Sequence, residues 1–542
     1  MSSLDLRRRF GIGALTALFA LQSVGCAPED DGLTNNEADP DSIVGANAVA
    51  RTITLRSYVY VRVGATDREV QQAAVNQIRP LFGALKAFDI GLGNRLDTPT
   101  ASSLIDATTF QRDTVNVIDP AQPDQSVGQM QRVRFTYSDR ATVHNRYSSR
   151  RAFPTVALFG DYNAHATDIV NNCQSEHRDW GASGIWYNYE PHLSACDARI
   201  KMETSRIDTE RRQLRNPDRE ITVSERDRWF LPISLSLKTI ARSENKYPDY
   251  HRMLDDNRVV IGSFFGEDKH DDPNDYGARN YFTYVREVLR VRPELRVTAT
   301  SPTTDLTTVT FNGQTVSNVT PQQVAGWIVD NTGYPSFVTD RNAFRLQVIR
   351  QWRDKLVTLS TPATMTVSGM RKSVTLEVRV FIGDEESWSG SSAAVQRYKR
   401  AFQEVDVFQY TGHSHLGSGP LDARNYAASD FPNRYQILMV NSCVSFNYYN
   451  TFFEMHPGGS RNLDTVTNGL PVYLEGSGLS SARFAAAFLD GRYRSYSDVL
   501  VSMRVNLAWE PNHDANRVAD GEPDNEFSPS RFPITLSVPA RQ

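Results

Sequence analysis

Two short apolar segments in the C-terminal half of the chain constrain the fold more than any other feature. They span Val405 to Tyr410 and Tyr435 to Val440, and both are rich in Val, Ile, Phe and Tyr. Runs of this length, bounded by Gly, Ser and Asn, predict strands of a parallel sheet that is covered on both faces. The sequence therefore predicts an α/β domain over residues 251–510, with its core in residues 365–500.

Each predicted strand ends close to side chains that can do chemistry. His413 and His415 follow the first strand, and Cys443 follows the second. In open α/β sheets, ligands bind beyond the carboxyl ends of the strands. We therefore expect His413 and Cys443 to meet at one edge of the sheet, although 30 positions separate them in sequence.

Neighbouring segments support the parallel arrangement. A strand at Val374 to Ile382 is followed by a helix at Ala393 to Phe402 and then by the strand before His413. This β-α-β order implies parallel pairing with a right-handed crossover. A third strand is predicted after Cys443, at Pro471 to Leu474.

This arrangement resembles that of the caspase-like cysteine peptidases, the superfamily of caspases, metacaspases, gingipains, clostripain and legumains. In these proteins an apolar strand ends in a Tyr-x-Gly-His-Gly-type turn, which Tyr410-Thr411-Gly412-His413 matches. A second strand ends in the nucleophile, which Asn441-Ser442-Cys443 matches. The histidine also precedes the cysteine, whereas papain-like enzymes have the opposite order. Family members usually have Gly after the histidine, and this chain has Ser414.

The resemblance implies a mostly parallel caspase-like sheet flanked by helices, and an endopeptidase that acts on a protein or peptide substrate through an acyl-enzyme. Cys443 is then the nucleophile and His413 the general acid and base. The backbone N–H groups of Ser414 and Cys443 are the expected oxyanion donors. His415 is the alternative base.

Two interpretations without catalysis stay open. Cysteine is among the most buried residue types, so Cys443 can be an inert core residue of an adhesin-like structural protein. Alternatively, the chain is an inactive pseudopeptidase or surface-binding lipoprotein, which the Ser414 departure favours. An imidazolium beside Cys443 lowers the thiol pKa below about 8.5, whereas burial in an apolar core raises that pKa. The direction of the shift therefore separates the interpretations.

Residues 1–26 predict an export signal. Arg7-Arg8-Arg9 precede an apolar segment from Gly11 to Leu21, which is too short to span a bilayer. The segment ends in Gly-Cys and resembles a bacterial lipobox, so we expect Cys26 to carry a lipid that holds the protein at the cell envelope, periplasmic or surface-facing. Secretion without a lipid is the alternative. The acidic residues 27–50 predict a flexible tether.

Residues 51–250 predict a separate mixed α+β domain, and residues 511–542 a C-terminal extension. An exported protein reaches an oxidising compartment, so Cys173 and Cys196 predict a disulfide, worth about 3 kcal/mol. Because Cys26 is assigned to the lipid, Cys443 remains as the odd thiol, which is a sign of reactivity in an exported protein.

Composition and spacing exclude several classes of function. The formal net charge is −4 and no concentrated basic face is evident, so no nucleic-acid partner is predicted. The histidines lack metal-binding spacings such as HExxH, so no metal or other cofactor is predicted. Glu267 to Asp275 and Asp514 to Glu526 are rich in oxygen ligands suited to calcium, but neither fits the EF-hand spacing, and surface loops are the favoured interpretation.

Overall fold

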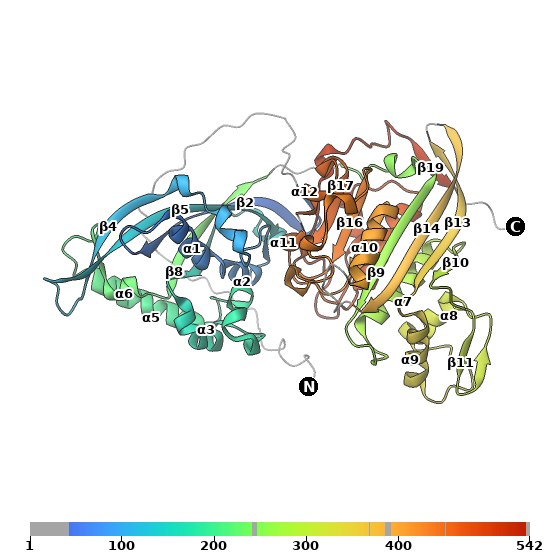
Figure 1. Ribbon diagram of the computed structural model, residues 1–542, viewed down its shortest axis with the longest axis horizontal. Helices are drawn as coiled ribbons and strands as arrows, with labels where there is room; N and C mark the ends of the chain where they lie inside the picture. The colour runs from blue at the N-terminus through green and yellow to red at the C-terminus, as the bar shows by residue number, and fades with distance from the viewer. Residues whose placement is uncertain (1–42, 241–245, 368, 385–391, 450, 538–542) are drawn as a thin grey trace. The chain divides into compact units, whose positions relative to one another are not determined.

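The structure is a computed structural model that describes residues 43–240, 246–367, 369–384, 392–449 and 451–537. They lie within a unit of the chain that spans Ala38–Gln542. This part of the chain is mixed α/β, as predicted, and contains two large sheets (Figure 1). The predicted signal peptide, Cys26 and the tether up to residue 42 lie outside the described residues.

The larger sheet has ten strands, in the order β1-β18-β17-β16-β15-β9-β14-β13-β10, with β19 beside β13. Its central strands run parallel to one another: β17 (Leu463–Asn468), β16 (Gln436–Asn441), β15 (Val407–Thr411), β9 (Arg258–Glu267) and β14 (Met370–Asp384). The remaining strands pair antiparallel: β1 (Val44–Gly45), β10 (Arg296–Ser301), β13 (Leu356–Val367), β18 (Arg517–Asp520) and β19 (Ile534–Ser537). The sheet is therefore mixed, with a parallel centre and antiparallel flanks.

Helices cover both faces of the parallel centre. On one face α7 (Tyr276–Val291), α13 (Ser477–Leu489) and α14 (Tyr496–Met503) share a core with Val407 and Ile437. On the other face α10 (Ala393–Glu404) shares a core with Phe408 and Leu438. Successive side chains of a strand point to opposite faces, so burial on both faces requires the continuous apolar runs seen in the sequence.

A smaller lobe lies in the chain between β10 and β13. Its hairpin consists of β11 (Val309–Phe311) and β12 (Gln314–Val316), and its helices are α8 (Pro321–Ala325) and α9 (Arg341–Trp352). Phe344 and Trp352 of α9 are buried in the same core as α7. The lobe therefore extends the helical layer on that face of the large sheet.

The second sheet belongs to the N-terminal region and has the order β6-β8-β2-β5-β4-β7, with β3 beside β5. Its strands are β2 (Ala48–Val61), β3 (Ile90–Leu92), β4 (Gln111–Ile118), β5 (Ser126–His144), β6 (Ala152–Leu158), β7 (Glu220–Thr222) and β8 (Phe230–Thr239). Its helices are α1 (Asp67–Ile78), α2 (Leu81–Lys86), α3 (Ala166–Cys173), α4 (Ile185–Asn188), α5 (Ser194–Arg211) and α6 (Val223–Arg226). This region therefore contains both helices and strands, which is typical of an α+β region.

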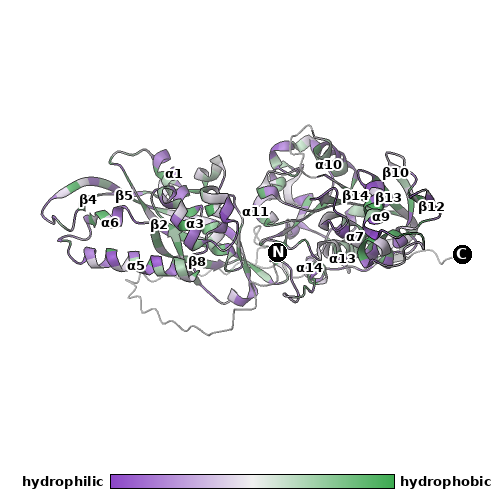
Figure 2. Ribbon diagram, turned by 90° about the horizontal axis from the view of Figure 1, so that it is seen from below, coloured by the Kyte–Doolittle hydropathy of each residue, from purple (hydrophilic) through white to green (hydrophobic). Residues whose placement is uncertain are grey.

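The predicted cysteine pair joins two helices of this region. Cys173 at the end of α3 and Cys196 in α5 have their sulfur atoms 2.00 Å apart, at disulfide distance. The rest of α5 is drawn mostly in the colour of hydrophilic residues (Figure 2). The Cys173–Cys196 link lies on the buried side of α5, in a small core with Ile169 and Ile200.

Both ends of the described chain contribute to the large sheet, which differs from the sequence prediction. Val44 and Gly45 pair with β18, although residues 43–50 were assigned to the flexible tether. Strands β18 and β19 lie in the segment predicted as a C-terminal extension. These strands have two to four residues, too short for a periodic signal in the sequence.

Two further predictions about the sheet were wrong. The strand after Cys443 is Leu463–Asn468, not Pro471 to Leu474. Strands β14 and β15 are parallel but not neighbours, because β9 lies between them and pairs with both. The insertion of β9 places a third strand end next to the predicted His413 and Cys443 edge.

Candidate functional site

The candidate site lies at the carboxyl ends of three adjacent parallel strands. Thr411 of β15 is in register with Phe265 of β9 on one side and with Asn441 of β16 on the other. His413 and Cys443 each follow two residues after these paired positions. Because Phe265, Thr411 and Asn441 are in register, the turns that carry His413 and Cys443 begin at the same level of the sheet.

His413 has a carboxylate neighbour that the sequence analysis did not assign. Its Nε2 lies 3.9 Å from Oδ1 of Asp268, the residue directly after β9, and the two side chains are 40% and 52% exposed. A carboxylate at this position is suited to orient the imidazole ring. The signal in the sequence is weak: Asp268 lies in the acid-rich segment Glu267 to Asp275, which also suits calcium.

The other carboxylates of that segment bond within the protein. Glu267 forms an ion pair with Arg353 and lies 3.0 Å from His270. Asp275 accepts hydrogen bonds from the backbone N–H groups of Asp268, Lys269 and Ala278, and so caps α7. The carboxylates of Glu267 and Asp275 therefore have partners within the protein, and no bound cation is needed to explain the acidic composition of this segment.

Cys443 is a free thiol in a largely buried position. Its Sγ donates to the carbonyl oxygen of Val472 at 3.5 Å. Burial raises the pKa of the thiol, while the nearby charge of Lys86 acts in the opposite direction. The net effect is a raised pKa, as expected for a core cysteine. In this conformation the protonated thiol is therefore the dominant form of Cys443 at neutral pH.

The backbone is strained at both turns. Val444, directly after Cys443, has φ 52°, and His415 and Leu416 have φ 46° and 53°. Positive φ is costly for a β-branched residue such as valine. Residues held in such conformations cluster at functional sites, where surrounding contacts maintain them.

A buried polar network supports the turn that carries Cys443. The side chain of Asn468, at the end of β17, donates to Asn441 Oδ1 at 3.2 Å and to the Ser442 carbonyl at 3.1 Å. Ser445 Oγ donates to the Val440 carbonyl at 2.7 Å and accepts from the Asn468 backbone at 2.8 Å. The network fixes the backbone on both sides of the thiol.

Arg517 of β18 completes this network. Its guanidinium donates to Asn468 Oδ1 at 3.0 Å and to Asn441 Oδ1 at 3.1 Å. Complete burial lowers the pKa of Arg517 to about 10, so the group stays charged at neutral pH. Arginine at this position was not identified from the sequence, because β18 itself was not predicted.

Ser414 and His415 occupy the short loop after His413. The Ser414 carbonyl accepts from the Tyr449 hydroxyl at 3.3 Å. Burial and the nearby charge of His413 lower the pKa of His415 to about 4, and the two imidazole rings are 5.8 Å apart. His415 is therefore neutral at pH 7, although the charge of Asp268 acts against this shift.

Residues of the N-terminal region contact both turns. In α11 (Ser445–Tyr449), Asn447 Nδ2 donates to the carbonyls of Leu92 at 3.1 Å and Asn94 at 2.7 Å. Arg95 donates to the Gly417 carbonyl at 3.2 Å and lies over the ring of Tyr448. The site is thus bordered by a segment far away in sequence, which no local pattern could reveal.

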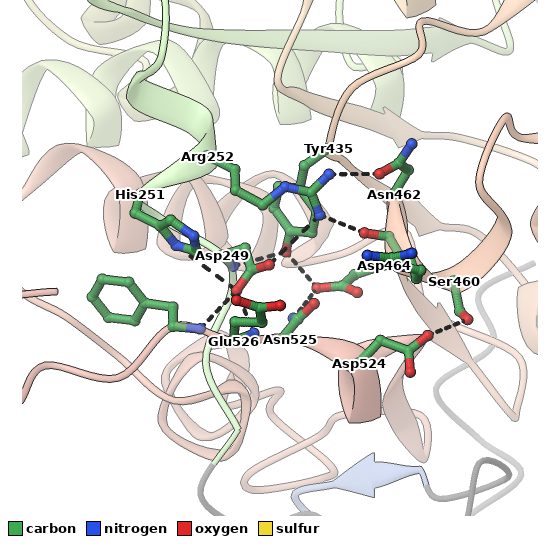
Figure 3. A network of polar contacts seen from close by, with 12 residues as sticks. Asp249, His251, Arg252, Tyr435, Ser460, Asn462, Asp464, Asp524, Asn525 and Glu526 are labelled. Carbon is green, nitrogen blue, oxygen red and sulfur yellow. Dashed lines mark hydrogen bonds and ion pairs between the residues drawn. The ribbon is translucent and has the colours of Figure 1, made fainter. Parts of the chain in front are cut away.

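A second polar region lies at the amino ends of the parallel strands (Figure 3). A cavity of about 440 Å³ opens there, and its lining includes Asp249, Arg252, Asp524 and Glu526. Within the described ranges, no group of three or more His, Cys, Asp or Glu side chains is arranged to hold a metal ion.

His456 is buried near Phe431, and burial lowers its pKa to about 4.

No protein-family model, curated protein or solved structure matches the chain. None of the helices in the described part of the chain is both long and apolar enough to cross a membrane.

Proposed function

We propose that the chain is a cysteine endopeptidase of caspase-like fold in which Asp268, His413 and Cys443 form the catalytic group. The observation that carries the proposal is their position: they follow the carboxyl ends of three adjacent parallel strands, and His413 lies 3.9 Å from Asp268. Ligand sites of open α/β sheets lie at such edges. The positive φ values around the thiol and the histidines add support.

The proposed reaction is acyl transfer from a peptide to the thiol. His413 takes the thiol proton as Sγ of Cys443 bonds to the peptide carbonyl carbon, and returns it to the leaving amine as the C–N bond breaks. The backbone N–H groups of Ser414 and Cys443 bind the oxyanion. Water then hydrolyses the thioester, which releases the acid and restores the thiol. Asp268 orients His413 and stabilises its charged form.

Alkylation of Cys443 tests this assignment. The proposal predicts that iodoacetamide labels the folded protein rapidly near about pH 6, because a neighbouring imidazolium favours the thiolate. His413→Ala should abolish this rapid phase, and His415→Ala should retain it. Retention only in His413→Ala would assign the base to His415. Cleavage of a mixed peptide library should disappear in Cys443→Ala.

Asp268→Asn provides a graded test of the carboxylate. If Asp268 orients His413, the variant should cleave peptides at least about tenfold more slowly, with a larger effect on kcat than on KM. Asp271→Asn is the matched control, since Asp271 lies in the same segment but pairs with Arg350 at the surface. Equal activities of the two variants would remove Asp268 from the mechanism.

The second candidate function is an inactive pseudopeptidase or surface-binding lipoprotein. The raised pKa of the buried Cys443 thiol and the Ser414 departure favour it. This alternative predicts slow alkylation at every pH until the protein unfolds. That result would contradict the peptidase proposal.

We also propose that a lipid on Cys26 anchors the protein at a bacterial cell envelope. The basis is the Gly-Cys cleavage site and the acidic segment that follows it. Wild-type protein should partition into detergent, and Cys26→Ala should remain in the aqueous phase. Aqueous partitioning of both would refute the anchor.

A further inference from the structure

A buried carboxylate lies at the amino end of the parallel sheet, at the opposite end of the strands from Cys443 (Figure 3). Asp464 is in β17 and is 0% exposed. Its Oδ2 accepts hydrogen bonds from the hydroxyls of Tyr435 and Tyr496, and from the side chain of Asn525 at 2.6 Å. One carboxylate oxygen is thus fully engaged by donors.

Four other oxygens beside it are buried without a hydrogen-bond donor from the described residues. They are Asp464 Oδ1, both carboxylate oxygens of Glu522, and Asn525 Oδ1. Glu522 is also 0% exposed. Such orphaned acceptors are rare in proteins, and each costs free energy unless a proton donor, water or a cation meets it.

The fold holds these residues together through β18. Thr465 of β17 pairs with Asp520, and the chain then turns at Gly521, which has φ 98°. A Cβ at Gly521 would lie 3.2 Å from Asp464 Cα, so the turn presses against the start of β17. Glu522 and Asn525 follow in η13 (Glu522–Asp524) and at its C-terminal cap.

Among the described residues, no lysine or arginine forms an ion pair with Asp464 or Glu522, although the charge of Lys246 acts on Glu522. The nearby Lys246 donates to the Asn525 backbone carbonyl at 2.9 Å, and no ion pair joins it to either carboxylate in the described chain.

We propose that Asp464, Glu522 and Asn525 bind a calcium ion through these four oxygens. All of them are hard oxygen ligands, with no imidazole or thiolate, which favours Ca²⁺ over zinc or copper. Two carboxylates match a divalent charge. Calcium accepts irregular sets of carboxylate, amide, backbone and water oxygens, whereas Mg²⁺ demands a near-ideal octahedron.

The cavity at the amino ends of the strands is lined by residues next to this cluster in sequence. Its lining includes Asp524 and Glu526, on either side of Asn525, together with Asp249, Arg252 and Arg461. The proposed site contains only two carboxylates and one amide. It therefore does not count among the groups of three or more His, Cys, Asp or Glu side chains considered above.

Terbium luminescence and thermal unfolding test the site in the full chain. Tb³⁺ should emit when tyrosine is excited, because Tyr435 and Tyr496 both donate to Asp464, and added Ca²⁺ should displace it. Saturating Ca²⁺ should raise the Tm by about 2–4 °C. Glu522→Gln should weaken Ca²⁺ binding by at least about tenfold, because it removes a ligand charge.

Two comparisons make the result decisive. Asp524→Asn, an exposed acid in the same turn, should leave Ca²⁺ affinity within about twofold of wild type. In EDTA, Glu522→Gln should unfold at the same temperature as wild type or higher, since it replaces a buried carboxyl group that has no hydrogen-bond partner among the described residues. If Glu522→Gln fails to fold, Asp464→Asn replaces it. Absence of a Ca²⁺ effect in wild type, or an equal effect in wild type and Glu522→Gln, would overturn the proposal.

Discussion

At the scale of single residues, the thiol of Cys443 and the amine of Lys86 influence each other. Lys86 lies 3.6 Å above the ring of Tyr187, and burial lowers its pKa to about 8, although Glu190, Glu176 and Cys443 act against that shift. Its positive charge in turn counteracts the burial that raises the pKa of Cys443. Lysine at this position therefore increases the thiolate fraction.

Replacement of Lys86 by methionine should raise the thiol pKa further. We expect iodoacetamide to label Cys443 at least about threefold more slowly at neutral pH in Lys86→Met, because the thiolate fraction falls as the thiol pKa rises. Lys201→Met, at an exposed position of α5, is the control. An unchanged rate in Lys86→Met would show that solvent screens the interaction.

At the scale of elements, the end of β17 controls the turn after β16. The Asn468 side chain bonds to Asn441 and Ser442, and also accepts from Arg517. Asn468→Ala should lower the free energy of unfolding by about 1–3 kcal/mol, because buried polar partners lose their bonds. Urea denaturation measures this, with the exposed Asn163→Ala as control. A loss equal to that of the control would contradict the supporting role of Asn468.

The elements that could be predicted are those with a strong apolar signal. Strands β15 and β16 were found within one or two residues, because burial on both faces makes them continuously apolar. Strand β17 was missed because four of the six residues in its sequence, LDTVTN, are polar. Asp464 and Asn468 are buried there only because Tyr435, Tyr496 and Arg517, distant in sequence, supply hydrogen bonds. Local patterns carry no information about such partners.

The candidate site was predictable to a similar extent. The positions of His413 and Cys443 at one edge follow from strand order and register, which the apolar runs encode. Asp268 required knowledge that β9 lies beside β15, and this neighbour relation depends on the whole sheet. The pKa of Cys443 is raised by burial and opposed by the charge of Lys86, which is distant in sequence, so its direction could not be predicted from the sequence.

At the scale of the whole molecule, buried carboxylic acids make stability depend on pH. Burial raises the pKa of Asp139 and Asp406 to about 6 and that of Asp464 to about 7. A folded state that holds such protons is stabilised fully below the unfolded pKa of about 3.9, and loses this stabilisation as pH rises through the folded pKa. The histidines with lowered pKa act in the opposite direction, but only below about pH 6.5.

Above that pH the buried pair Asp464 and Glu522 dominates the change. We expect the free energy of unfolding in EDTA to fall between about pH 6.5 and pH 8, by about 1 kcal/mol from Asp464 alone, because the unfolded chain no longer binds the protons that the native cluster retains. Urea denaturation across this range measures the slope. Asp464→Asn should flatten it, since an amide does not titrate, whereas Asp524→Asn should leave it unchanged. A free energy of unfolding that rises over the same range would contradict this prediction. It would mean that Asp464 and Glu522 are ionised in the native protein and that a group other than a proton or calcium stabilises their charges.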